Sequence, residues 1–273
     1  MWGTIIGDIA GSVYENPVDG AASIKTKEFP FWGEGCRFTD DTVTTVAVSQ
    51  ALMESRAQGR AVTPLLCQYL RHWCRRFSGV GYGPRFIRWY ESDDMGPYGS
   101  WANGAAMRVA PAGWLTDTLA ETQYLAELTA VVTHNTEEAV RGAVAVASAI
   151  YLARTGIRRD DMRIYLHDRF YPLDRRLEDI RRDYVFTSRT SCSVPEAIEA
   201  FLESTDYEDA VMRFPWVEIR IHRLPLPAVL PKHTMVYRSR CARRRRLIFQ
   251  KKSASRLTGF IPIYMRERRG YHD

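Results

Sequence analysis

Apolar residues recur at helical spacing through most of the first 211 residues, whereas the alternation typical of β-strands is scarce. This constrains the chain to an all-α body in which short links join the helices. Residues 78–104 contain six glycines, which predicts a long loop suited to the floor of a binding site. The spacing predicts helices over Thr39–Glu54, Pro64–Phe77, Leu119–Val132, Glu137–Arg154, Arg159–Arg169, Leu173–Ile180 and Pro195–Glu203.

The charge pattern changes at Met212. Residues 212–273 hold 16 Lys and Arg against three Asp and Glu, which leaves 22 basic and 29 acidic residues for positions 1–211. The body is therefore net −7 and the tail net +13, and the overall charge of +6 describes neither part. We expect a helical domain over 1–211 and an irregular basic tail over 212–273.

The remaining composition points to the cytoplasm. The five cysteines form no Cys-x-x-Cys pair and their number is odd, which favours a reducing compartment. The first residues lack the pattern of a signal peptide, and no apolar run approaches 18 residues. We therefore expect a cytoplasmic protein with no membrane partner.

A hydroxyl and two adjacent carboxylates, Thr39, Asp40 and Asp41, stand where the first predicted helix begins. Thr39 is a favoured N-cap residue, and the two aspartates then fall in the first turn beside the positive end of the helix dipole. Three oxygens that point the same way can hold a hard cation such as Mg²⁺, which also keeps some waters. Taken alone, the same residues also describe an ordinary capped helix.

Three further segments carry residue types suited to a site. Glycines that lead into a helix can gather backbone N–H groups where phosphate binds, although an ordinary turn is the simpler interpretation. A lone carboxylate such as Glu15 is typical of a solvated surface, and a lone histidine such as His134 is more often structural. The segments are Gly7-Asp8-x-x-Gly11-x-x-x-Glu15, Gly99-Ser100-x-x-Asn103-Gly104-x-x-Met107-Arg108 and Thr133-His134-Asn135.

Together with Phe38-Thr39-Asp40-Asp41-Thr42 and in this order, these segments resemble the ADP-ribosylglycohydrolase family, over residues 1 to about 211. That family includes the dinitrogenase reductase-activating glycohydrolases and the ADP-ribosyl-acceptor hydrolases. The resemblance implies an orthogonal all-α fold with two Mg²⁺ ions in a cleft. It also implies hydrolysis of the glycosidic bond between ADP-ribose and an acceptor.

The resemblance assigns roles to residues of this chain. It implies that Thr39, Asp40 and Asp41 bind metal and that Glu15, Asp40 and Asp41 are catalytic. Cleavage at an anomeric carbon passes through an oxocarbenium-like state, and a metal ion can orient ribose hydroxyls and lower the pKa of a bound water. The substrate-binding residues implied are Gly99, Ser100, Asn103, Gly104, Met107 and His134.

The chain departs from the family pattern after residue 211. The family closes its metal site with a second motif, Gly-Gly-Asp-x-Asp-Thr, which the tail does not contain. Read from the third base of each codon, the degenerate codons of Val211–His222 permit Asn-Ala-Val-Ser-Leu-Gly-Gly-Asp-Ser-Asp-Thr. We interpret the tail as the product of a single-frame slip near Val211, and we expect it to pack poorly.

Three functional hypotheses follow. The first is a Mg²⁺-dependent ADP-ribosylglycohydrolase that is impaired, because the chain supplies one half of a two-metal site. The second is a non-catalytic protein that binds ADP-ribose or an ADP-ribosylated protein or small molecule. The third is a basic nucleic-acid-associated protein. It is the least favoured, because apolar residues such as Trp216, Ile219 and Phe249 interrupt the tail, unlike a solvated arm.

Overall fold

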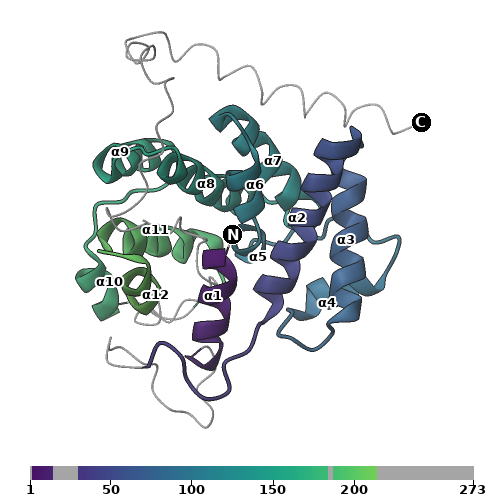
Figure 1. Cartoon of the computed structure of the whole chain (residues 1–273), viewed down its shortest axis with the longest axis horizontal. Helices are drawn as coiled ribbons and strands as arrows, with labels where there is room; N and C mark the ends of the chain where they lie inside the picture. Colours follow the sequence, from purple (N-terminus) through teal and green to yellow (C-terminus); the bar gives the residue numbers. More distant parts are fainter. Residues whose placement is uncertain (1, 15–29, 184–186, 214–273) are drawn as a thin grey trace, which may run out of the picture. The chain divides into compact units, whose positions relative to one another are not determined.

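The computed structural model describes residues 2–14, 30–183 and 187–213, which lie within one compact unit. Their regular structure is helical, apart from a single antiparallel bridge between Ala102 and Arg189 (Figure 1). The predicted all-α body is therefore confirmed, while Glu15 and the tail from 214 onward lie outside the described residues. None of the described helices combines the length and apolar composition needed to cross a bilayer. The helices are α1 (Trp2–Gly11), η1 (Ser12–Tyr14), α2 (Asp40–Gln58), α3 (Val62–Arg76), α4 (Pro84–Glu91), α5 (Gly104–Met107), α6 (Ala110–Leu115), α7 (Leu119–Val131), α8 (Glu137–Arg154), α9 (Arg159–Arg169), α10 (Leu177–Asp183), η3 (Thr190–Cys192), α11 (Val194–Glu203) and α12 (Tyr207–Arg213).

The helix predicted over Thr39–Glu54 continues to Gln58, and two further predicted ranges need correction. The glycine-rich stretch 78–104 is not one loop, because Pro84 begins α4 and that short helix buries Phe86, Trp89 and Tyr90. Helix α10 begins at Leu177 rather than at Leu173. Its first N–H group, that of Leu177, donates to the Glu203 carboxylate at 2.9 Å, so a side chain from α11 sets where the helix starts.

Helix α8 occupies the centre of the described core and contacts α5, α6, α7, α9 and α11. Its bounds, Glu137–Arg154, are those predicted, and its buried face consists largely of alanine. Small residues allow the neighbouring elements to approach closely. A Cβ atom on Gly142 would lie 2.2 Å from the Thr190 side chain, and one on Gly113 would lie 2.7 Å from Ile150.

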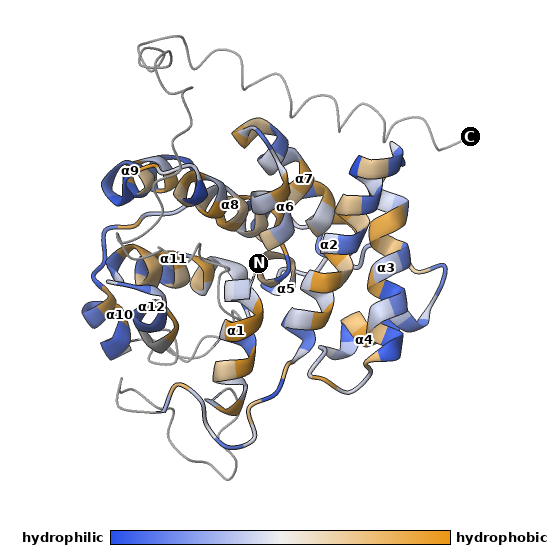
Figure 2. Ribbon diagram, viewed as in Figure 1, coloured by the Kyte–Doolittle hydropathy of each residue, from blue (hydrophilic) through white to orange (hydrophobic). Residues whose placement is uncertain are grey.

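Helices α2 and α3 form a second packed pair beside this centre, and α1 contacts α2. Figure 2 shows α1 as largely apolar, whereas α10 is largely hydrophilic. At the opposite end of the described chain, Tyr207 of α12 donates a hydrogen bond to the Gly3 carbonyl at 2.6 Å. Helix α1 is thus held by both α2 and α12, which matters because α1 and α2 supply residues to the site described next.

Candidate functional site

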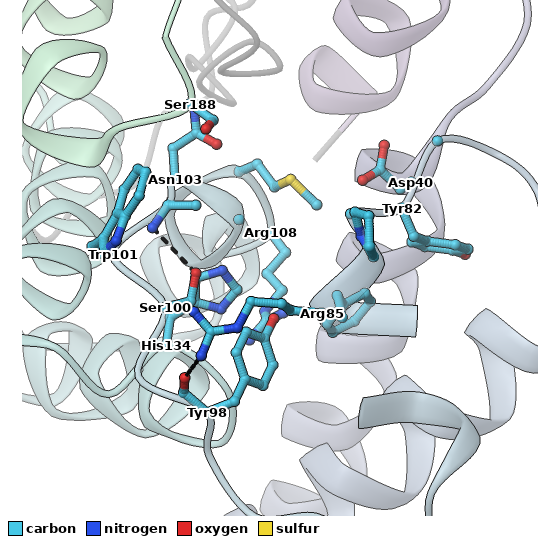
Figure 3. A pocket seen from close by; sticks show the side chains of 17 residues that line it. Asp40, Tyr82, Arg85, Tyr98, Ser100, Trp101, Asn103, Arg108, His134 and Ser188 are labelled. Atoms are coloured by element: carbon cyan, nitrogen blue, oxygen red, sulfur yellow. Dashed lines mark hydrogen bonds between the residues drawn. The ribbon is translucent and has the colours of Figure 1, made fainter. Parts of the chain in front are cut away.

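A pocket opens where the first turn of α2, the start of α4, the segment 98–104 and the turn between α7 and α8 meet. Its volume of about 430 Å³ suits a small organic ligand. Figure 3 shows Asp40 on one side of this pocket, with Ser100, Tyr98 and Arg85 gathered away from it. We call these two sides the Asp40 end and the His134 end, since His134 lies beside the second group.

The Asp40 end is held by a carboxylate from another helix. Asp8 of α1 is fully buried and accepts hydrogen bonds from the N–H groups of Thr39 at 2.8 Å and Thr42 at 3.2 Å. It also accepts from the Thr39 hydroxyl and, at 2.5 Å, from the Thr42 hydroxyl. Asp8 therefore satisfies the N–H groups at the start of α2 in place of a local cap.

This arrangement corrects one expectation about Thr39, that its side chain caps α2. Thr39 occupies the N-cap position with an extended backbone, as predicted, but its side chain makes no capping hydrogen bond. Its single hydroxyl proton goes to Asp8, and the other carboxylate near the hydroxyl, that of Asp41, lies at the longer distance of 3.3 Å. A lone pair of the Thr39 oxygen is thereby left for a cation.

The two aspartates that follow Thr39 differ in position. Asp40 lines the pocket, and its N–H group donates to the Val80 carbonyl at 3.2 Å. Asp41 is fully buried and does not line the pocket. Of the two carboxylates, Asp40 alone lines the pocket, so a ligand bound there would reach Asp40 directly.

The carboxylate of Asp40 and the hydroxyl of Thr39 are oxygen donors of the kind that Mg²⁺ prefers, and an ion held by them would retain several waters. Within residues 2–14, 30–183 and 187–213, no group of three or more His, Cys, Asp or Glu side chains is placed to hold a metal ion.

The segment 98–104 is fixed by contacts with α8 and with the chain before η3. Gly99 has φ +63° and donates its N–H to the Asn135 side chain at 2.9 Å, while the Thr136 hydroxyl donates to the Ser100 carbonyl at 2.9 Å. The N–H of Asn103 donates to the Ser188 carbonyl at 2.9 Å. Some of the N–H groups expected to cradle a phosphate are therefore already bonded within the protein.

The His134 end is built around a buried cation. Arg108 is 1% exposed, and its Nη2 donates to the Thr133 hydroxyl at 2.6 Å and to the Thr129 carbonyl at 3.0 Å. The Thr133 hydroxyl lies 2.7 Å from Nδ1 of His134. Burial, followed by the charges of Arg108 and Arg85, holds the pKa of His134 well below its usual value, so the imidazole is neutral at pH 7.

Arg85 brings an exposed positive charge to this end. Its guanidinium donates to the Tyr98 carbonyl and lies over the Tyr98 ring, 5.1 Å from the ring centre. Burial raises the pKa of Tyr98 to about 12, so that ring stays neutral. Among the described residues that line the pocket, Asp40 supplies the negative charge and Arg85 and Arg108 the positive charge.

The outer rim of the pocket carries Trp101, which is 49% exposed. The Arg189 guanidinium lies 5.8 Å from its ring centre and pairs with Glu138 at 3.1 and 3.2 Å. The backbone is also fixed here, because the Thr190 hydroxyl donates to the Trp101 carbonyl at 2.8 Å. An exposed aromatic ring held in this way offers a surface on which a flat ligand ring can stack.

The structure brings most of the predicted site residues together. Of the predicted residues that the structure describes, Thr39, Asp41 and Gly99 do not line the pocket. Sequence reasoning missed Arg85, because a glycine-rich stretch was expected to stay a loop. It also gave no role to Asp8, Trp101, Arg108 and Thr133, which lay inside quoted segments. The predicted residues that line the pocket are Asp40, Ser100, Asn103, Gly104, Met107 and His134.

Comparison with known proteins agrees with this architecture. A model of the family described as ADP-ribosylglycohydrolase matches residues 1–214. A solved structure described as an "ADP-ribosylglycohydrolase-related protein complex" is 19% identical, covers 82% of this chain and 81% of its own, and superposes with a TM-score of 0.61, which shows a shared fold. Comparison with curated protein sequences finds no match. Because the family model spans well over half of the sequence, this chain belongs to the ADP-ribosylglycohydrolase family.

Proposed function

We propose that this chain binds the ADP-ribosyl group in the pocket between Asp40 and His134, and that its Mg²⁺-dependent hydrolysis of the glycosidic bond is weak. The observation that carries the proposal is the separation of charge within one pocket. A carboxylate lies at the Asp40 end, and a guanidinium and a neutral imidazole lie at the His134 end. An ADP-ribosyl group needs both, because its diphosphate is anionic and its scissile ribose carries hydroxyls.

At the His134 end, the diphosphate would be met by side chains. Arg85 is exposed and its charge is available to a phosphate, since its present partners are a carbonyl and a ring face. Ser100 is 8% exposed and its hydroxyl already accepts from the Ala102 N–H at 3.2 Å, so its proton can turn to a ligand oxygen. The adenine ring would stack on Trp101 at the rim.

At the Asp40 end, Asp40 and Thr39 would hold one Mg²⁺, with Asp41 behind them. When bound, the ion would orient ribose hydroxyls and lower the pKa of a water. Asp8 fixes the Thr39 hydroxyl, and Asp40 stays in place because its N–H is bonded to the Val80 carbonyl. The glycosidic bond to be cut would join the ribose at this end of the pocket to the acceptor.

Weak hydrolysis follows from the incomplete donor set. The described residues contain no group of three or more His, Cys, Asp or Glu side chains placed to hold a metal ion, and the tail does not carry the second motif that the family resemblance calls for. The same observation favours a second candidate, a protein that binds ADP-ribose without turnover. The two candidates share the pocket and differ in whether the glycosidic bond is cut.

Calorimetric titration of ADP-ribose, with and without Mg²⁺, tests the proposal. We expect binding to the wild-type chain that Mg²⁺ strengthens, and loss of the Mg²⁺ effect in Asp40→Asn. Asp117→Asn is the matched control, because Asp117 is an exposed aspartate in an ion pair with Arg56. Absence of ADP-ribose binding to the wild-type chain would refute the proposal.

Turnover is measured separately on ADP-ribosyl-arginine and ADP-ribosyl-serine peptides. A second protein, in which the shifted reading frame is restored after Val211, serves as the comparison. We expect faster cleavage by the restored protein. Equal, measurable activity of the two proteins would contradict the weak-hydrolysis part of the proposal. No turnover by the wild-type chain would select the binding candidate.

A further inference from the structure

His134 meets the pocket through one of its two ring nitrogens, and the other nitrogen faces a hydroxyl that is itself tied to a buried cation. Nδ1 lies 2.7 Å from the Thr133 hydroxyl, and that hydroxyl lies 2.6 Å from Nη2 of Arg108. All three side chains are nearly or fully buried, with exposed fractions of 4% for His134, 0% for Thr133 and 1% for Arg108. The hydrogen bonds therefore connect Arg108 to Thr133 and Thr133 to His134.

The number of protons that each group can donate fixes the direction of these two hydrogen bonds. A guanidinium can only donate, so the Thr133 oxygen accepts from Arg108. The single hydroxyl proton of Thr133 is then available to Nδ1. If Nδ1 carried the imidazole proton instead, the Thr133 hydroxyl proton would face no acceptor in a fully buried place, which costs about 1–3 kcal/mol.

The charged state of the imidazole is also disfavoured. His134 faces Arg108 on one side and Arg85 across the Tyr98 ring, whose centre lies 5.6 Å from that of His134. The pocket carboxylate, Asp40, belongs to the opposite end. Burial and the two neighbouring cations lower the pKa of the imidazole, so His134 is neutral at pH 7.

We infer that Arg108 and Thr133 are positioning residues that hold His134 as the neutral tautomer with its proton on Nε2, which makes it a fixed hydrogen-bond donor to an anionic group in the pocket. The inference rests on the proposed ADP-ribose site for the identity of that anion. Gly104 keeps this edge of the ring open, because a Cβ atom there would lie 2.9 Å from Nε2. In this state His134 is not a general base at Nε2, because that nitrogen already bears a proton.

Nitrogen chemical shifts of the full chain test the inference directly. The protein contains six histidines, and loss of one signal in His134→Gln assigns the residue. We expect Nδ1 of His134 to show the shift of a bare nitrogen and Nε2 that of a protonated one, unchanged from pH 8 to pH 6. A protonated Nδ1, or a titration of His134 near pH 6.5, would overturn the inference.

Variants of Thr133 separate positioning from packing. Thr133→Val removes the hydroxyl at nearly constant volume, and we expect mixed His134 tautomers and about tenfold weaker ADP-ribose binding, the loss of roughly one hydrogen bond. Thr133→Ser keeps the hydroxyl and should restore both. Thr129→Val is the matched control, since its buried hydroxyl donates to the Ala126 carbonyl and Arg108 meets its backbone oxygen.

The outcomes remain separable from those of the proposed function. If ADP-ribose does not bind the wild-type chain, the proposed function fails, while the nitrogen shifts still decide the tautomer. If ADP-ribose binds and Thr133→Val binds it as tightly as the wild-type chain does, the positioning role is refuted. Equal losses in Thr133→Val and Thr129→Val would also refute it, because packing would then explain the effect.

Discussion

At each end of the pocket a buried charged side chain forms hydrogen bonds with threonine hydroxyls, and the two buried charges have opposite signs. At the Asp40 end, the buried anion Asp8 holds the hydroxyls of Thr39 and Thr42. At the His134 end, the buried cation Arg108 holds the hydroxyl of Thr133. At the His134 end the Thr133 hydroxyl links the buried charge to His134, whereas at the Asp40 end the buried charge fixes the start of the helix that carries Asp40.

The ends differ in how fully the buried charge is satisfied. Asp8 accepts from two backbone N–H groups and two hydroxyls and lies at the positive end of the α2 dipole. Arg108 has one carbonyl, one hydroxyl and, 5.7 Å away, the ring of Phe86. Burial lowers the pKa of Arg108. We therefore expect the Asp40 end to govern stability and the His134 end to govern binding.

The largest expected effect is that of Asp8→Asn. The amide keeps one acceptor oxygen but turns an NH₂ group toward the donors at the start of α2. We expect the free energy of unfolding to fall by about 2–4 kcal/mol, as measured by urea denaturation. Asp93→Asn is the control, because Asp93 forms an exposed ion pair with Arg75, and it should change stability by less than about 1 kcal/mol. Similar values for the two variants would remove the contrast between the ends.

The next effect concerns the pH dependence contributed by His134. Its pKa in the folded chain lies below that in the unfolded chain, so the unfolded chain binds more protons as the pH falls below about 6.5. Stability should therefore fall toward lower pH, by up to about 1.4 kcal/mol per pH unit from this residue. The difference between the wild-type chain and His134→Gln, measured by urea denaturation at pH 7, 6 and 5, isolates it.

A second buried group makes that subtraction necessary. Burial raises the pKa of Glu196 on α11 to about 7, so the stability linked to its protonated form is present below pH 4.5 and lost as the pH rises through 7. This slope opposes that of His134, and it cancels when two proteins with the same Glu196 are compared. A difference that does not change between pH 7 and pH 5 would show that His134 titrates normally.

Sequence reasoning succeeded where local rules decide the outcome. The bounds of α8 and α9 follow from apolar spacing and from Thr136, whose hydroxyl accepts from the Ala139 N–H at 3.3 Å. It failed where a distant residue decides. Asp8 caps α2 from 31 positions away, so the hydroxyl of Thr39 could not be assigned from its neighbours.

The candidate site shows the same division. The resemblance assigned site roles to residues of the quoted segments, and six of the residues so assigned line the pocket. The arrangement of the segments could not be predicted, because Arg85 enters through a short helix that glycine spacing concealed. The link from Arg108 to Thr133 joins positions 25 apart, and it depends on how α5 packs against the chain after α7.

Binding is expected to respond to Arg85→Gln, which removes the exposed charge of the His134 end. We expect ADP-ribose affinity to fall about five- to tenfold in low salt, and the difference to shrink in high salt because exposed charges are screened. Arg88→Gln is the control, since Arg88 is also exposed on α4 and does not line the pocket. Equal losses would indicate a general charge effect, with no specific phosphate contact by Arg85.

The smallest effect is expected at the rim, where Arg189→Gln removes the ion pair with Glu138. Such exposed pairs contribute about 0.2–1 kcal/mol, so urea denaturation should show a loss within that range. Affinity for ADP-ribose should change less than about threefold, because the Trp101 carbonyl still accepts from Thr190 and the Asn103 N–H still donates to Ser188. A tenfold loss of affinity in calorimetry would mean that the Arg189 guanidinium itself orders the Trp101 ring. The pocket would then be governed at its rim as much as at its two ends.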